Sequence, residues 1–161
     1  NVNFPYVKKY MYTHSAHLQA GTNWPVYRYA EVLLYLAEAI NEQPGRQAEA
    51  LTYINNAIGT SAVSIRGRAG LAPVVAATQE DVRTAIAQER KIELAFENKR
   101  LPDLIRTGTL QAVISAYGAK VKADPAAYYF PAGYGPSAQA FVTIDEHWPL
   151  PAAEALYSPY F

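Results

Sequence analysis

The chain has 161 residues, half of them hydrophobic and 17% of them charged, a composition typical of a folded globular protein. Fourteen lysines and arginines balance fourteen aspartates and glutamates, so the chain has no net charge and no basic cluster to bind nucleic acid through its phosphates. It has no cysteine, which excludes thiol catalysis and cysteine-ligated metals. It also has no apolar run approaching the ~20 residues that cross a bilayer.

The first 25 residues are aromatic and polar and have no sustained hydrophobic period. Pro25 restricts Trp24 to extended backbone, so we expect an extended lead-in to the first helix. The sequence starts with neither a methionine nor a signal-peptide pattern. Such a start suits part of a longer protein whose export signal lies upstream; the alternative is a trimmed part of a cytosolic protein.

The next segment predicts two paired helices. Residues 26–42 carry an apolar stripe at helical spacing, and Val32 and Leu36 add apolar side chains on other faces, so we expect this helix to be covered on more than one side. Pro44 and Gly45 end it, and a second amphipathic helix extends to residue 58. Residues 26–58 would form an αα-hairpin about as long as a tetratricopeptide repeat of ~34 residues. The stripe consists of Ala30, Leu33, Leu34, Ala37 and Ile40.

Residues 59–77 have the composition of a loop, and charged helices are expected over residues 78–117. Thr78, followed three residues later by Asp81, has the pattern of a helix cap, and the first charged helix is expected to continue to about residue 98. Its apolar stripe includes Glu89 among Val82, Ala85, Ile86, Ile92 and Phe96.

Two breaks follow this helix. Pro102 interrupts it or begins a new helix, because proline lacks the amide proton, and Gly108 ends the short helix that results. Thr109 is then expected to cap a further helix. The apolar face of that helix consists of Leu110, Val113, Ile114 and Tyr117.

The charged helix places carboxylates on the face that a helix normally buries. Glu89, Glu93 and Glu97 stack one turn apart if the helix continues through all three. Buried carboxylates are tolerated only when they are paired and hydrogen-bonded. We predict a structural ion-pair network; the alternative, a metal or acid–base site, fits less well because interleaved arginines neutralise carboxylates and repel a cation. The predicted members are Glu89, Arg90, Glu93, Glu97, Arg100, Asp103 and Arg106.

The composition changes at Gly118. Residues 118–161 are rich in aromatic residues and proline, and proline at this density disfavours both helix and central strand. We expect a long ordered region packed against the helices, with one short strand at residues 141–144. The predicted fold is mainly α, with a long irregular C-terminal region.

No catalytic residue, metal site or cofactor is predicted. His14, His17 and His147 are the natural general bases, but no nucleophile elbow, phosphate loop or dinucleotide fingerprint accompanies them.

The aromatic residues are the better functional signal. Thirteen tyrosines and two tryptophans supply rings that combine apolar area with a polar tip, the combination that carbohydrate recognition uses. The alternative is that these rings simply cover the helices, and we assign Trp148 to the core. The candidate ligand-binding residues are Trp24, Tyr128, Tyr129 and Tyr134.

Four segments, in this order, resemble the signature of the SusD/RagB family of surface nutrient-binding proteins. They are RYAEVLLYLAEAINE (28–42), RGRAGL (66–71), ERKIELAFENKR with DLIRTG (89–108) and WPLPAAE (148–154). Members of the family are several times longer, so the resemblance covers their C-terminal part, and the remaining N-terminal part would belong to the same protein.

The resemblance implies a lipoprotein on the extracellular face of the Bacteroidetes outer membrane, anchored through an N-terminal cysteine that is absent from this chain. Such proteins bind oligosaccharides without catalysis and deliver them to a SusC-like TonB-dependent transporter that they cover. Some relatives handle peptides instead. A helical-repeat scaffold that binds another protein is a different class, and the αα-hairpin fits it equally well.

Overall fold

The computed structural model describes residues 7–11, 23, 25–55 and 65–146. All regular secondary structure in these residues is helical, which confirms the mainly α class. The chain divides into two compact units, Asn1–Ile86 and Ala87–Phe161, and the division falls within helix α4 (Gln79–Glu93). No helix in the described part of the chain is long and apolar enough to cross a membrane.

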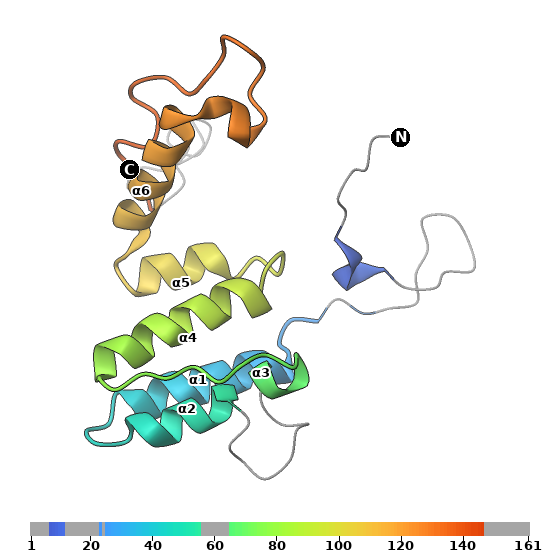
Figure 1. Ribbon diagram of the computed structural model, residues 1–161, viewed down its shortest axis with the longest axis vertical. Coiled ribbons are helices and arrows are strands. Elements are labelled where there is room, and N and C mark those ends of the chain that lie inside the picture. Colours follow the sequence, from blue (N-terminus) through green and yellow to red (C-terminus); the bar gives the residue numbers. More distant parts are fainter. Residues whose placement is uncertain (1–6, 12–22, 24, 56–64, 147–161) are drawn as a thin grey trace, which may run out of the picture. The chain divides into compact units, whose positions relative to one another are not determined.

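The first unit is built around a pair of helices, α1 (Tyr29–Asn41) and α2 (Gln47–Asn55), which pack side by side (Figure 1). The whole predicted apolar stripe of α1 is buried, together with Ala50 and Ile54 of α2. The short η1 (Lys8–Tyr10) precedes the pair, and α3 (Ile65–Arg68) packs against α2. The predicted end of the second helix at residue 58 lies outside the described residues, and its likeness to a tetratricopeptide repeat stays a prediction.

The described residues do not cover the second apolar face that was predicted for α1. Val32 is 50% exposed and Leu36 is 40% exposed. Tyr29, one turn before Val32, is also exposed. These residues form an apolar strip that stays open in the described part of the chain.

Two hydrogen bonds join the end of α1 to the start of α4. The buried Asn41 donates from Nδ2 to the Gln79 carbonyl oxygen over 3.0 Å, and Gln79 donates from Nε2 to the Asn41 carbonyl oxygen over 2.8 Å. The Asn41 carbonyl is one of the last four of its helix, which have no partner within the helix, so the second bond caps α1. Sequence spacing does not predict this exchange, because the two amides are distant along the chain.

The second unit contains the end of α4, then α5 (Arg100–Arg106), α6 (Leu110–Ala123) and the short η2 (Pro125–Tyr128). Pro102 stands in the first turn of α5, where its missing amide proton costs no hydrogen bond. Gly108 adopts a positive φ of 64° after α5. The Thr109 and Gly108 amides then donate to the Leu104 and Ile105 carbonyls over 2.9 and 3.0 Å, which confirms the predicted stop.

The prediction that the charged helix continues to residue 98 is wrong. Helix α4 ends at Glu93, and Phe96 and Asn98 both take positive φ in the turn that follows. The chain turns to begin α5, so Phe96 leaves the apolar stripe and is exposed, while Leu94 is buried. Ile92, still within α4, is exposed as well. The apolar period of the sequence runs through the turn and therefore suggests one long helix.

Three expectations for the chain after α5 are also wrong. Residues 141–144 form a turn and a bend in place of a strand, because their backbone groups bond to α6 side chains, and the described residues contain no strand to pair with them. Thr109 does precede α6, but its side chain does not cap the helix; its hydroxyl lies 2.8 Å from that of Thr107. Helix α6 also continues past Gly118, where irregular structure was expected, to Ala123.

The predicted cap of α4 is a reciprocal capping box. The Thr78 hydroxyl accepts from the Asp81 amide over 3.1 Å and donates to the Asp81 carboxylate over 2.7 Å. The Thr78 amide donates to the same carboxylate oxygen over 3.2 Å. These donors hold the pKa of Asp81 below its ordinary value of 3.8, and the Thr78 hydroxyl is the largest cause.

Replacing Thr78→Val should raise the pKa of Asp81 toward 3.8, because the strongest donor to the carboxylate is lost. A depressed folded pKa stabilises the fold above the ordinary value, and this contribution is lost as pH falls through the folded value. Stability of the variant should therefore depend less on pH below about 4. Carboxyl NMR titration measures the shift, with the exposed Thr84→Val on the same helix as control. An unchanged Asp81 pKa in Thr78→Val would contradict the assignment.

Candidate functional site

The centre of the second unit is a buried ion pair between α4 and α5. Arg90 donates from Nε to Asp103 Oδ2 over 2.7 Å and from Nη2 to Asp103 Oδ1 over 2.8 Å. The two side chains are only 3% and 10% exposed. Arg106, one turn later on α5, donates from Nε to Asp103 Oδ1 over 3.0 Å. Two guanidinium groups thus hold one carboxylate, with forked geometry on the buried side.

The other predicted members of the network differ in whether they have interaction partners. Glu89 and Glu97 are buried and Glu93 is half-buried, and each has interaction partners in the structure. Glu97 lies in the turn after α4, so the three glutamates do not form a continuous helical stack. Arg100 has no carboxylate partner among the described residues; its side chain lines a pocket instead.

The arrangement of these side chains fits a structural role better than a catalytic one. Both oxygens of the Asp103 carboxylate are occupied by guanidinium donors, so this acid is not presented to a substrate. No group of three metal-ligating side chains is found in the described residues. The three histidines lie outside the described residues.

An aromatic loop follows α6. We use this name for residues 129–146, which contain no helix. Four hydrogen bonds from three α6 side chains fasten the loop. Lys122 donates to the Ala138 carbonyl over 2.7 Å, and Ser115 donates to the Phe141 carbonyl over 2.9 Å. Gln111 donates to the Val142 carbonyl over 2.9 Å and accepts from the Ile144 amide over 3.0 Å.

Aromatic packing adds to this attachment. The Tyr117 ring on α6 meets Tyr128 edge-on at 5.4 Å between centroids, and Phe141 at 6.4 Å. Phe141 lies so close to Gly118 that a Cβ at this glycine would come within 2.4 Å of the Phe141 side chain. A glycine in mid-helix is therefore required here by close packing.

The candidate ligand-binding tyrosines differ in how far their rings are buried. Tyr128 is half-buried in the ring cluster and supports the loop. Tyr129 is 92% exposed and Tyr134 is 72% exposed, so both rings are presented to solvent. Tyr129 is the C-terminal cap of η2 and has left-handed backbone, with a φ of 65°. Trp24 lies outside the described residues.

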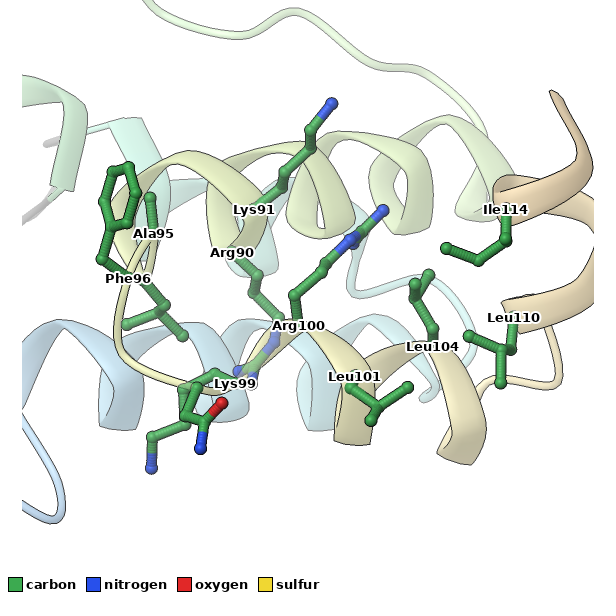
Figure 2. A pocket seen from close by; sticks show the side chains of 12 residues that line it. Arg90, Lys91, Ala95, Phe96, Lys99, Arg100, Leu101, Leu104, Leu110 and Ile114 are labelled. Atoms are coloured by element: carbon green, nitrogen blue, oxygen red, sulfur yellow. The ribbon is translucent and has the colours of Figure 1, made fainter. Parts of the chain in front are cut away.

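A pocket of about 370 Å³ is the feature that sequence reasoning missed (Figure 2). It is lined by the end of α4, the turn after it, α5 and the start of α6. Its charged lining consists of Arg90, Lys91, Lys99 and Arg100, and its apolar lining includes Phe96 and four leucines. The signal in the sequence is that two pairs of adjacent basic residues flank one turn.

Replacing Asp103→Ala should lower the free energy of unfolding by about 3–5 kcal/mol, because it leaves the buried Arg90 without its main partner. The double variant Arg90→Met with Asp103→Leu should regain much of this loss, since it removes both buried charges. Urea unfolding measures both. Glu49→Ala, which breaks an exposed pair with Arg46, is the control and should change little. Equal losses for Asp103→Ala and the control would contradict this account.

Gly118→Ala should destabilise the protein by about 1–3 kcal/mol, because the added methyl group overlaps Phe141. Helix propensity alone predicts the opposite, a gain of about 1 kcal/mol. Ala119→Gly, at the exposed neighbouring position, is the matched control and should cost about 1 kcal/mol through propensity alone. Urea unfolding with near-ultraviolet circular dichroism of the tyrosines measures stability and the loop together. A stabilised Gly118→Ala variant would show that the loop does not pack there.

Comparison with known proteins identifies the family of the chain. A model of the SusD family matches residues 1–159. SusD-like protein P2 of Formosa agariphila is 37% identical over 110 residues, which cover 65% of this chain and 22% of the relative. SusD-like protein P25 of the same organism is 36% identical over 121 residues, which cover 71% of this chain and 21% of the relative. The chain thus matches about a fifth of the length of these relatives, and no solved structure gives a significant match. The chain belongs to the SusD family.

Proposed function

We propose that the protein containing this chain binds oligosaccharides at the cell surface and passes them to a SusC-like TonB-dependent outer-membrane transporter. Two findings support the proposal: membership in the SusD family, and exposed tyrosine rings on a loop that is fastened to a helix. The proposal includes a lipid anchor at the extracellular face of the outer membrane, attached to a cysteine outside this chain. Binding and release, without catalysis, would be the whole of the activity.

The physical basis is the presentation of Tyr129 and Tyr134. A sugar packs the apolar C–H face of its ring against an aromatic side chain, while the tyrosine hydroxyl remains available for hydrogen bonding. The Tyr129 and Tyr134 amides donate to the Ala126 and Pro131 carbonyls over 3.2 and 2.9 Å, and the hydrogen bonds from α6 restrain the loop farther along the chain. A restrained backbone loses less conformational entropy when ligand binds, and this loss is one of the main costs of association. The exposed tyrosines on the fastened loop are the observation that carries the proposal.

A second candidate function is a scaffold whose partner is another protein. The observation in its favour is the apolar strip of α1, in which Tyr29, Val32 and Leu36 are exposed. Exposed apolar residues gathered on one helix face are common at protein interfaces. A peptide-binding protein of the RagB type is the third possibility, and it would use the same tyrosines.

Replacing Tyr129→Ala and Tyr134→Ala should each weaken glycan binding about two- to tenfold, because one stacking surface is removed. Affinity electrophoresis of the full-length protein against a panel of polysaccharides identifies a ligand, and calorimetry then gives the affinities. The control is Tyr29→Ala, an exposed tyrosine of the other unit, which should bind as the wild type does.

Unchanged affinity in both loop variants would contradict the proposed site. If no polysaccharide binds and the protein captures a partner other than a TonB-dependent transporter from membrane extracts, the scaffold function gains support. In that case Val32→Glu should abolish the capture, because it places a charge in the apolar strip. Capture of a TonB-dependent transporter fits the first proposal.

A further inference from the structure

The pocket of the second unit has an unbalanced charge. Its four charged lining residues are all cationic, and no aspartate or glutamate lines it. They come from two places: Arg90 and Lys91 near the end of α4, and Lys99 and Arg100 at the start of α5. Like charges brought together in this way repel one another unless an anion neutralises them.

Two of these four cations are available to a ligand. Arg90 is committed to Asp103, and Figure 2 shows the Lys99 side chain extending away from the others. Lys91 and Arg100 extend toward the same side of the pocket in that view. Neither of them forms an ion pair with a carboxylate in the described part of the chain. An arginine beside a lysine is a suitable receptor for a carboxylate, because the guanidinium fork matches its two oxygens.

An exposed ring stands in the same pocket. Phe96 lines it and is 70% exposed, and its φ of 66° is a conformation that bulky residues rarely adopt. Strain of this kind often accompanies functional sites. Here it holds an aromatic face outward, at the other end of the pocket from the charged ends of Lys91 and Arg100 (Figure 2). Leu101, which is 50% exposed, adds apolar surface.

We propose that this pocket is a second saccharide subsite, specific for acidic oligosaccharides: Lys91 and Arg100 bind the carboxylate of a uronic acid, and the Phe96 ring packs against the C–H face of another sugar of the same oligosaccharide. The inference rests on the proposed function, since it assumes that the protein binds glycans. It adds the charge of the ligand, which the tyrosines of the aromatic loop do not specify.

The test is calorimetry of the full-length protein with a galacturonic acid trimer and with a neutral galactose trimer as probes. Lys91→Gln and Arg100→Gln should each weaken binding of the acidic trimer about tenfold, because each removes a charged hydrogen-bond donor. Added salt should weaken binding of the acidic trimer to the wild type. Lys120→Gln, on exposed α6 surface outside the pocket, is the matched control and should bind normally. Circular dichroism checks that Lys91→Gln, at an exposed position, remains folded.

The outcomes separate this inference from the proposed function. If neutral glycans bind but the acidic trimer does not, or binds independently of Lys91 and Arg100, the subsite is wrong and the proposed function stands. If polyglutamate binds as tightly as the acidic trimer and with the same dependence, the pocket recognises anions without regard to sugar, and the subsite is again wrong. If neither trimer nor any other polysaccharide binds, both proposals fail.

Discussion

The second unit depends on one buried contact, the fork between the Arg90 guanidinium and the Asp103 carboxylate. Helix α5 spans only Arg100–Arg106, too short to be stable in water without tertiary support. Removing two charges from water is costly, and the cost is offset only where the geometry is good and the remaining hydrogen bonds are made. The fork fulfils this condition and Arg106 adds a second donor. The pair therefore fixes the position of α5 relative to the end of α4.

The turn between the two helices follows from this constraint. Phe96 and Asn98 occupy the left-handed region of backbone space, which asparagine tolerates and phenylalanine does not favour. Such a conformation persists where the structure on both sides determines it, and here the buried Leu94 and the ion pair do so. The same turn carries the aromatic ring of the cationic pocket. Stability and the proposed recognition thus share one short segment.

The aromatic loop is held by a different principle. Its backbone carbonyls accept hydrogen bonds from the side chains of Gln111, Ser115 and Lys122 on α6. These bonds take the place of the backbone hydrogen bonds that a neighbouring strand would supply. Gly118 lets Phe141 approach the helix closely, and edge-on ring contacts complete the attachment. The second unit therefore presents two surfaces of different chemistry, exposed tyrosines on the loop and cations around the pocket. The first unit presents an apolar strip on α1, which suits a protein partner.

Much of the fold could be read from the sequence because it depends on neighbours along the chain. Helical spacing identified the buried face of α1, the capping pattern placed the start of α4, and Gly108 placed the end of α5. These features are local, since each is decided by residues within one or two turns. The family signature was also visible, because its motifs are contiguous runs of residues.

Tertiary structure decided the rest. It ended α4 at Glu93, where the apolar period alone would have continued the helix, and it exchanged the amides of Asn41 and Gln79. It paired Asp103 with Arg90 in a buried ion pair, while Arg100 lines a pocket. It also sorted Tyr128 into the ring cluster while exposing Tyr129. In each case the outcome depends on which residues, distant along the chain, lie within a few ångströms of one another. The spacing of residues along one helix does not predict such contacts.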